Sequence, residues 1–421
     1  VFELDVESGM LRAVSLGEGA TYNAPVGYMP GEQAVLLVSD YQEGVRRLFL
    51  RDLRTGEIRK PLPDLDAFDL DTRAALSEAR TLLCVVANRD GYGEPRLVEL
   101  PTFATVEFPL EERGVVSGVR FDGDRLVFSL SNARIPSLAF AWTVGDDAIE
   151  PLVQAESDLD LSSFVLPELV TYPTFDGREI PAFMTLPTDA TPGTPLPFVI
   201  IFHGGPEGQH RPTFDRWTQY LVANGFGVLE PNVRGSTGYG REFHTLDNGA
   251  KRWDSVRDGA AAARWLVDQG FAEAGRIGAY GGSYGGFMSV AVILEAPDLF
   301  GCAVDIVGIV NFETFLERTG AYRRALREAE YGSLDDREML RGISPIHRVD
   351  EIQVPMMIAH GLNDPRVPVY EAMQLAVGLQ ARGLDPELVY FPDEGHGFAK
   401  LANRIVFYER AARFLRTHLA E

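Results

Sequence analysis

Residues 276–287 read Arg-Ile-Gly-Ala-Tyr-Gly-Gly-Ser-Tyr-Gly-Gly-Phe, and this stretch decides the fold. A short apolar run, Ile277–Tyr280, leads into Gly281-Gly282-Ser283-Tyr284-Gly285, and an apolar run over 287–294 follows. The pattern predicts a strand, a sharp turn and a helix, with Ser283 at the turn. Because the flanking glycines let strand and helix approach closely, the serine hydroxyl stays exposed. The stretch favours a nucleophilic serine; the alternative is an ordinary serine in a glycine-rich strand end.

Composition limits the classes of protein to which the chain can belong. Its 421 residues are too many for one small core, so we expect two domains. No apolar run is long enough to span a membrane, and a net charge of −22 argues against nucleic acid or an anionic membrane as partner. Cys84 and Cys302 stand in apolar runs, which predicts buried reduced thiols and a cytoplasmic location. Since no Cys/His cluster has zinc spacing, we expect no metal and no cofactor.

Residues 1–160 carry a weak repeat of short strands. The last strand of each copy reads Phe2-Glu3-Leu4, Leu48-Phe49-Leu50, Leu97-Val98-Glu99-Leu100 and Phe140-Ala141-Trp142. Another apolar strand precedes the last three copies, at Val35–Asp40, Leu82–Asp90 and Leu126–Asn132. A repeat of roughly 40–50 residues built from short strands is typical of β-propeller blades. The alternative is an irregular β-sandwich.

Three blades and a stub strand are too few to close a propeller ring, which takes about four to eight blades. The first copy also has no partner strand in the sequence pattern, which would leave an open edge. The sequence therefore predicts a partial, truncated propeller. We expect Val1 not to be a natural start and a missing upstream propeller segment to be a partner of this domain.

From residue 161 to 421 the pattern changes to alternating strands and helices, which predicts an α/β domain with a mostly parallel sheet. The expected strands are Leu169–Pro173, Ile180–Leu186, Phe198–Phe202, Gly227–Glu230, Ile277–Tyr280, Cys302–Ile306, Met356–Ala359 and Glu387–Phe391. The expected helices lie near Phe214–Asn224, Trp253–Gln269, Phe287–Ala296, Tyr370–Ala381 and Leu401–Leu419.

A serine hydroxyl needs a base and a group that orients the base, and in an α/β-hydrolase the acid and the histidine follow the serine along the chain. Asp364 follows the strand Met356–Ala359, where open parallel sheets place their chemistry. His396 follows the strand Glu387–Phe391 and lies between two glycines. These two residues are the predicted acid and base. The alternatives are a turn-capping aspartate and a surface histidine.

The tetrahedral intermediate of such a reaction needs preorganised N–H donors. We expect one donor at the backbone of Tyr284, directly after the serine. We expect the other at Gly205, in the loop His203-Gly204-Gly205-Pro206 that follows a predicted strand. The alternative interpretation of this glycine pair is a tight turn.

These motifs together resemble the prolyl oligopeptidase family of serine peptidases, and most closely its acylaminoacyl-peptidase-like branch. The resemblance covers about 200 residues and rests on the segments 203–206, 232–240, 281–286, 360–368 and 394–398. It implies hydrolysis of peptides or N-acylated peptides through an acyl-enzyme, with Ser283 as nucleophile, His396 as base and Asp364 as orienting acid. It also implies an assembly of copies as one arrangement, because relatives often form homo-oligomers.

The resemblance assigns further residues to substrate binding. Arg366, two positions after the acid, occupies the place of an arginine that grips a substrate carbonyl, and a structural ion pair is the alternative. The segment 307–331 corresponds to the pocket beside the scissile bond. There Phe312, Phe315 and Leu316 predict an apolar pocket or, equally, a helix packing on the core. Arg323 and Arg324 could bind a carboxylate; a solvated helix face paired with glutamates is the alternative.

Several functions share these residues. A serine carboxypeptidase, another oligopeptidase and a carboxylesterase all use the same triad, because a fold does not fix a substrate. A non-catalytic protein that uses its propeller for interactions is a further alternative. The absence of a recognisable Glu-Glu motif disfavours a dipeptidyl aminopeptidase.

Overall fold

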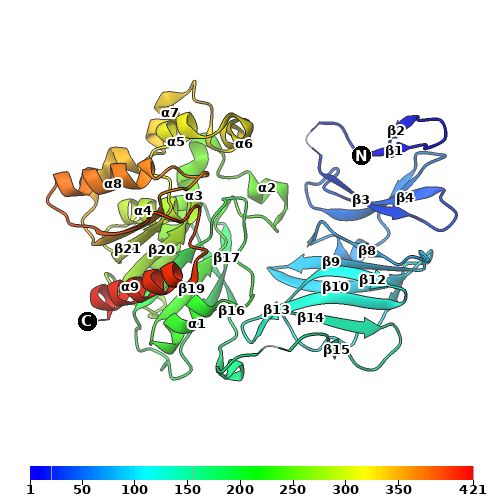
Figure 1. The fold of residues 1–421 in the computed structure, drawn as a ribbon, viewed down its shortest axis with the longest axis horizontal. Coiled ribbons are helices and arrows are strands. Elements are labelled where there is room, and N and C mark those ends of the chain that lie inside the picture. Colours follow the sequence, from blue (N-terminus) through cyan, green and yellow to red (C-terminus); the bar gives the residue numbers. More distant parts are fainter. Residues whose placement is uncertain (20, 155, 421) are drawn as a thin grey trace. The chain divides into compact units, whose positions relative to one another are not determined.

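The computed structural model of the chain describes residues 1–19, 21–154 and 156–420. These residues form two compact units (Figure 1). Unit 1 consists of Val1–Leu166 together with two short segments from later in the chain, Arg211–Asp215 and Thr237–Phe243. Unit 2 consists of the remaining residues from Pro167 onward. The sequence-based boundary after residue 160 lies just before Leu166, where the first stretch of unit 1 ends.

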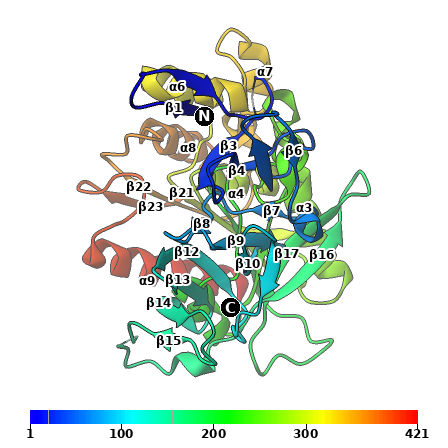
Figure 2. The ribbon, with the colours of Figure 1, turned by 90° about the vertical axis from the view of Figure 1, so that its right-hand side faces the viewer.

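Unit 1 is built from short strands in three sheets, which Figure 2 shows in blue and cyan. The two-stranded sheet pairs β1 (Phe2–Leu4) with β2 (Leu11–Ala13), and the four-stranded sheet contains β3 (Asn23–Tyr28), β4 (Ala34–Ser39), β5 (Arg47–Asp52) and β6 (Ile58–Arg59). The nine-stranded sheet contains β7 (Asp69–Leu70), β8 (Ala75–Leu76), β9 (Leu82–Arg89), β10 (Tyr92–Glu99), β11 (Ala104–Val106), β12 (Val115–Asp122), β13 (Arg125–Asn132), β14 (Ile135–Thr143) and β15 (Glu150–Pro151).

The strands that the repeat predicts are present, but the predicted last strand of each copy is not the last. A further short antiparallel strand, β6, β11 or β15, follows each of β5, β10 and β14. The first copy is also not without a partner, because β1 pairs with β2. Strands of two or three residues are too short to show an alternating pattern, which is why the sequence did not reveal them.

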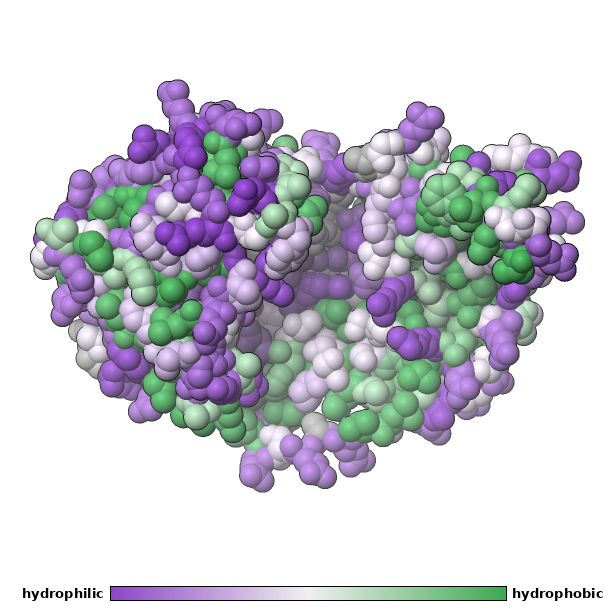
Figure 3. All heavy atoms as spheres, turned by 45° about the horizontal axis from the view of Figure 1, so that its top comes forward, coloured by the Kyte–Doolittle hydropathy of each residue, from purple (hydrophilic) through white to green (hydrophobic). Residues whose placement is uncertain are grey.

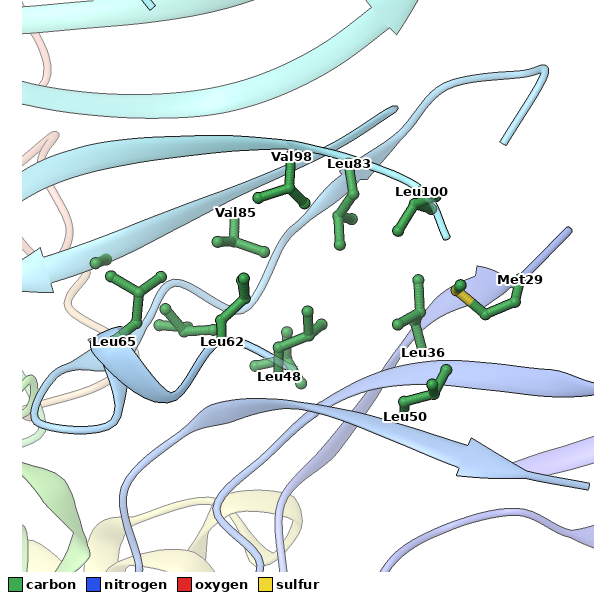
Figure 4. Packing of buried hydrophobic residues seen from close by; sticks show 13 residues of the cluster. Met29, Leu36, Leu48, Leu50, Leu62, Leu65, Leu83, Val85, Val98 and Leu100 are labelled. Atoms are coloured by element: carbon green, nitrogen blue, oxygen red, sulfur yellow. The ribbon is translucent and has the colours of Figure 1, made fainter. Parts of the chain in front are cut away.

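The core of unit 1 is apolar on both faces of β4 and β5. Alternate residues of a strand point to opposite faces. Leu36 and Leu50 pack on one face against Leu83 of β9 and Val98 of β10 (Figure 4). Leu37 and its neighbours pack on the other face, in a second cluster that contains Val14, Leu16, Val35, Leu37 and Phe49. Because both faces of β4 and β5 are apolar, each face must be covered by other residues of unit 1, and this packing stabilises the neighbouring sheets as well.

An eight-stranded sheet forms the centre of unit 2. Its strands lie in the order β16 (Glu168–Pro173), β17 (Glu179–Thr185), β19 (Gly227–Pro231), β18 (Phe198–Phe202), β20 (Ile277–Gly282), β21 (Phe300–Ile306), β22 (Met356–Gly361) and β23 (Glu387–Phe391). β16 and β17 pair antiparallel, and the strands from β19 to β23 run parallel. All eight strands predicted from the sequence are confirmed, with ends shifted by two residues or fewer.

Helices cover both faces of this sheet. In Figure 1, α1 and α9 lie on one face, and α3, α4 and α8 lie on the other. These five helices correspond to the predicted ones, at Arg216–Ala223 (α1), Arg252–Asp268 (α3), Tyr284–Glu295 (α4), Tyr370–Ala381 (α8) and Leu401–Leu419 (α9). The structure adds short helices at Gly240–His244 (α2), Phe312–Arg318 (α5), Ala321–Tyr331 (α6) and Arg337–Gly342 (α7), with 3-10 turns at Pro63–Leu65, Leu161–Ser163, Gly249–Lys251 and Pro345–Glu351.

Polar and apolar residues are mixed on the surface of the protein. The face in Figure 3 shows hydrophilic residues with hydrophobic ones interspersed. Within the described residues, every helix is too short or too polar to cross a lipid bilayer. Cys84 and Cys302 are both buried and carry free thiols, and burial raises the pKa of the Cys84 thiol to about 12.

Asp305 is a charged residue in the core of unit 2, near the end of β21. It is fully buried, and burial raises the pKa of its carboxyl from 3.8 to about 7. The backbone N–H of Gly308 offsets part of that rise, and the nearby carboxyl of Glu371 adds to it. Between those pH values the folded protein keeps a proton that the unfolded chain releases, so the stability of the fold decreases as pH rises through this window.

The Asp305→Asn variant should therefore gain stability relative to the wild type as pH is raised from about 4 to about 8. Thermal unfolding followed by circular dichroism at several pH values measures the difference, which should grow by a few degrees. Asp298→Asn, at an exposed position, serves as the control for the loss of a carboxyl group. A difference for Asp305→Asn that does not change with pH contradicts the interpretation.

Candidate active site

Ser283 occupies a strained turn between β20 and α4. Its backbone has φ 61° and ψ −117°, a region that residues with side chains rarely adopt. Glycine on both sides is required by space: a Cβ on Gly281 would lie 2.2 Å from the carbonyl oxygen of Gly285, and a Cβ on Gly285 would lie 2.1 Å from that of Phe202. The side chain at the turn is half-buried. The structure therefore has the strand, turn and helix that the sequence predicts around this serine.

The contact between Gly285 and β18 predicts a large cost for any side chain at this position. Gly285→Ala should lower the free energy of unfolding by about 3 kcal/mol, because the new methyl group must displace the backbone of Phe202. Urea denaturation measures this change. Gly342→Ala is the matched control, since a Cβ there meets no atom within 4 Å. Equal stabilities of the two variants would show that the turn is less tightly packed than described.

Asp364 and His396 form a hydrogen-bonded pair at the carboxyl ends of β22 and β23. His396 Nδ1 lies 2.7 Å from Asp364 Oδ2. The other oxygen, Oδ1, accepts the backbone N–H groups of Arg366 at 2.7 Å and Val367 at 3.0 Å. Burial by itself would raise the pKa of the Asp364 carboxyl, but His396 and these two N–H groups outweigh it, and the pKa lies below its ordinary value. A carboxylate only accepts, so Nδ1 of His396 is the donor in this hydrogen bond, and in the neutral imidazole Nε2 is then the nitrogen that can accept a proton.

Neighbouring side chains hold the two loops in place. The buried His360 makes a hydrogen bond of 2.9 Å between Nε2 and the carbonyl oxygen of Val367, and burial lowers the pKa of its imidazole. A neutral His360 then donates from Nε2 and braces the Asp364 loop. In the His396 loop, the carboxylate of Glu394 accepts the backbone N–H groups of Ala399 at 3.0 Å and Lys400 at 2.9 Å.

The serine turn lies at the same edge of the sheet as this pair. Parallel strands present their carboxyl ends at the same edge of a sheet. Here β21 lies between β20 and β22, and β23 is the next strand after β22. In the described part of the chain, no hydrogen bond joins Ser283 to His396. Such contacts often tighten only when substrate binds.

The loop after β18 lies directly beside the serine. A Cβ on Gly204 would be 3.5 Å from the Cβ of Ser283 and 3.2 Å from the carbonyl oxygen of Gly282. Gly205, the predicted donor, has φ 139°, and its carbonyl oxygen accepts the hydroxyl of Tyr331 at 3.3 Å. The sequence prediction did not include Tyr331, because it is far from the glycine loop in the chain and no local motif marks it.

The predicted donor Tyr284 begins α4, so its backbone N–H lies at the first turn of that helix. Its side chain is fully buried and points away from solvent. The hydroxyl group lies 2.7 Å from Ser255 Oγ and donates to Asp247 Oδ2 at 3.1 Å. Neither partner was predicted, since neither residue belongs to a recognisable motif.

Arg366 follows the acid in an exposed loop. Among the described residues its guanidinium has no ion-pair or hydrogen-bond partner. The alternative of a structural ion pair therefore has no support from the structure, and the guanidinium is available to an external group.

The predicted pocket residues Phe312, Phe315 and Leu316 lie on α5 and are fully buried. The ring centroid of Phe312 lies 5.2 Å from that of Phe287 and 4.8 Å from that of Tyr331. The alternative interpretation, a helix that packs on the core, describes these contacts directly. Apolar residues at helical spacing serve a pocket wall and a core equally well, so the sequence could not separate them.

The predicted carboxylate-binding arginines lie on α6 and are half-buried. Arg324 donates from Nη2 to the carbonyl oxygens of Glu317 at 3.1 Å and Thr319 at 3.2 Å. It thus satisfies carbonyl groups at the end of α5, which is a structural role. Arg323 has no side-chain partner in the part of the chain that the structure describes. The alternative of pairing with glutamates is found at Arg327, which forms an ion pair with Glu330.

No metal centre accompanies these residues: the described ranges hold no group of three or more His, Cys, Asp and Glu side chains arranged to bind an ion.

A parallel sheet with a strained serine turn and an aspartate–histidine pair at its carboxyl edge defines an α/β hydrolase. The sequence profile of the prolyl oligopeptidase family matches residues 212–421. The chain belongs to this family of serine peptidases.

Two curated relatives are similar over most of the chain. Dipeptidyl aminopeptidase BIII of Pseudoxanthomonas mexicana is 31% identical over 309 residues, which cover 70% of this chain and 44% of that protein. The acylamino-acid-releasing enzyme of Sus scrofa is 26% identical over 315 residues, which cover 71% of this chain and 43% of that enzyme. The chain thus spans less than half the length of either relative.

Solved structures resemble both units of the chain. A puromycin-hydrolyzing peptidase of Mycobacterium tuberculosis has a TM-score of 0.88 at 24% identity, covering 98% of this chain and 64% of its own. The acylaminoacyl peptidase of Pyrococcus horikoshii has a TM-score of 0.74 at 19% identity, covering 92% of this chain and 62% of its own. At these identities the likeness shows the fold.

Proposed function

We propose that the chain is a serine peptidase that cleaves short or N-acylated peptides through an acyl-enzyme, in the manner of an acylaminoacyl peptidase. The observation that carries the proposal is the 2.7 Å hydrogen bond between His396 and Asp364, at the edge of the sheet where Ser283 stands. A neutral imidazole whose Nδ1 proton is held by a carboxylate is the base that a serine hydroxyl needs.

In the proposed reaction Ser283 Oγ attacks the substrate carbonyl carbon, and His396 Nε2 takes the hydroxyl proton. Asp364 stabilises the imidazolium that forms. His396 then returns the proton to the leaving amine, which departs as the C–N bond breaks. Water then attacks the carbonyl carbon of the acyl-enzyme while His396 Nε2 takes a proton from it. His396 returns this proton to Ser283 Oγ as the ester bond breaks, and the acid is released. The backbone N–H groups of Tyr284 and Gly205 stabilise the oxyanion of both tetrahedral intermediates.

The names of the two curated relatives support a substrate from which a dipeptide or an acylamino acid is released. The exposed Arg366 supports a peptide over a simple ester, because its guanidinium, which has no partner in the described ranges, can donate to a peptide carbonyl near the cleaved bond. Phe312, Phe315 and Leu316 would contribute to the wall behind the pocket. Arg323 is the better of the two arginines for binding a carboxylate, because its side chain has no partner among the described residues.

Further parts of the proposal concern the rest of the protein. The four-stranded antiparallel sheet β3–β6 and the set β12–β15 support blades of a partial propeller in unit 1. A peptide substrate and a second copy of the chain are the proposed partners. The two free buried thiols support a cytoplasmic location.

Labelling with a fluorophosphonate tests the nucleophile. The wild-type chain should be labelled at Ser283, and Ser283→Ala should lose the label and lower kcat by about ten-thousandfold or more. The exposed Ser333 supplies the control, because Ser333→Ala should be labelled like the wild type. An unlabelled wild-type chain would defeat every hydrolytic interpretation.

A panel of matched peptides then identifies the substrate class. The same sequence with a free N-terminus, with an N-acetyl group and with an amidated C-terminus should separate the possibilities. Preference for the acetylated peptide supports the acylaminoacyl-peptidase-like proposal. Release of dipeptides from the free N-terminus would instead favour the activity that the name of the Pseudoxanthomonas mexicana relative describes.

Arg366→Met should raise KM for peptide substrates by about tenfold, because a hydrogen bond from a charged donor is lost. Hydrolysis of p-nitrophenyl acetate, which has no second carbonyl to grip, should change by less than about twofold. Arg264→Met provides a matched control at another exposed arginine, on α3. Equal effects on peptide and ester would argue against a contact with the peptide.

A further inference from the structure

A buried ion pair lies behind the proposed active site. Asp247 and Arg252 are both fully buried in unit 2. The guanidinium donates from Nη1 to Asp247 Oδ2 and from Nη2 to the carbonyl oxygen of Glu330 at 3.1 Å. Separating the two charges would leave each of them uncompensated in the core, which is costly. The side chains of Asp247 and Arg252 are therefore held firmly in contact. Neither residue is part of the triad or of its hydrogen bonds.

The ion pair contacts the first proposed oxyanion donor through the side chain of Tyr284. The Tyr284 hydroxyl donates to Asp247 Oδ2 at 3.1 Å, and the Arg252 guanidinium lies 5.2 Å from the centre of the ring. The backbone N–H of the same residue is the donor that directly follows Ser283. Fixing the ring therefore fixes the residue that carries this donor.

The ion pair contacts the second donor through Tyr331. The Arg252 guanidinium lies 4.8 Å from the centre of the Tyr331 ring, and Phe312 packs on that ring with centroids 4.8 Å apart. The Tyr331 hydroxyl then donates to the carbonyl oxygen of Gly205 at 3.3 Å. Burial raises the pKa of this hydroxyl well above its ordinary value, so it remains a donor at every pH at which the enzyme would work.

The hydrogen bond from Tyr331 restrains a backbone position that is otherwise free to rotate. A glycine at φ 139° has no side chain to restrict its rotation. A turn of the Gly205 backbone would re-aim the N–H that has to meet the oxyanion. Catalysis by preorganised donors depends on their being in place before the charge develops.

We propose that the Asp247–Arg252 ion pair positions both oxyanion donors, through Tyr284 on one side and Tyr331 on the other, and that Tyr331 is a positioning residue for the hydrolysis. This inference rests on the proposed function, since it concerns the same reaction. Tyr331 does not touch the reacting atoms; it acts through Gly205.

Tyr331→Phe tests the proposal, because it removes the hydroxyl and keeps the packing of the ring. We expect kcat for an N-acetyl-aminoacyl p-nitroanilide to fall about tenfold, a part of the loss that follows removal of a whole oxyanion donor. KM should stay within about twofold. The inhibition constant of a boronic acid with the same acyl group, which forms a tetrahedral anion on the serine, should rise about tenfold.

Tyr172→Phe is the matched control. Tyr172 is also fully buried in unit 2, and its hydroxyl donates to the carbonyl oxygen of Asp258 at 3.1 Å, away from the glycine loop. It should lose comparable stability in urea denaturation and keep kcat within about twofold. A second variant, Tyr284→Phe, tests the other arm and should lower kcat by at least about threefold with KM unchanged.

Three results would overturn the proposal: kcat of Tyr331→Phe within twofold of the wild type, a rise in KM alone, or an equal loss of kcat in Tyr172→Phe. Failure of the proposed function is a different result. In that case the wild-type chain is neither labelled at Ser283 nor active on any peptide, and the positioning role falls with it.

Discussion

Backbone packing around Ser283 is the constraint on which the rest of unit 2 depends. The ends of β18, β20 and β21 and the start of α4 meet where no side chain fits: a Cβ on Gly286 would lie 2.4 Å from Asp305 Oδ1, and one on Gly285 only 2.1 Å from a carbonyl oxygen of β18. This contact holds the serine in its strained turn. It also brings the Gly204–Gly205 loop, which continues from β18, against the serine. One steric requirement thus places both the proposed nucleophile and its proposed oxyanion loop.

The sequence predicts the parts of unit 2 that have a local signature. Runs of apolar residues define all eight strands, glycines define the turn at Ser283, and loops after two strands identify Asp364 and His396. The strands β6, β11 and β15 of unit 1 were not predicted because two or three residues are too few to show a period. Helices at the positions of α5 and α6 are among the alternatives that the sequence offers for Phe312 and Arg323, but it does not give their bounds. Phe312 illustrates a different limit: its apolar character is readable, but whether it faces substrate or core is decided only by the packing.

The network behind the proposed oxyanion donors could not be predicted from the sequence for another reason. Asp247, Arg252 and Tyr331 lie in unrelated polar or charged segments, and each would pass for a surface residue. Only the fold brings these side chains together and buries them away from water. Buried charges and polar groups must keep their partners, so the side chains have few alternative arrangements. Interactions of this kind are set by tertiary structure, so sequence motifs identify the proposed reactive groups but not the residues that hold them in place.

The order of the strands has a consequence for how such an enzyme can diversify. β21 stands between the strand that delivers the serine and the strand that delivers the aspartate, yet the segment after it contributes no group to the proposed proton transfers. That segment, 307–311, leads into α5 and is tethered from behind by Glu371, which accepts the N–H groups of Val310 at 3.2 Å and Asn311 at 2.8 Å. Substitutions in this segment therefore leave the proposed nucleophile, base and acid in place as long as Gly308 is kept, because a Cβ there would lie 2.8 Å from the carbonyl carbon of Gly286 in the serine turn.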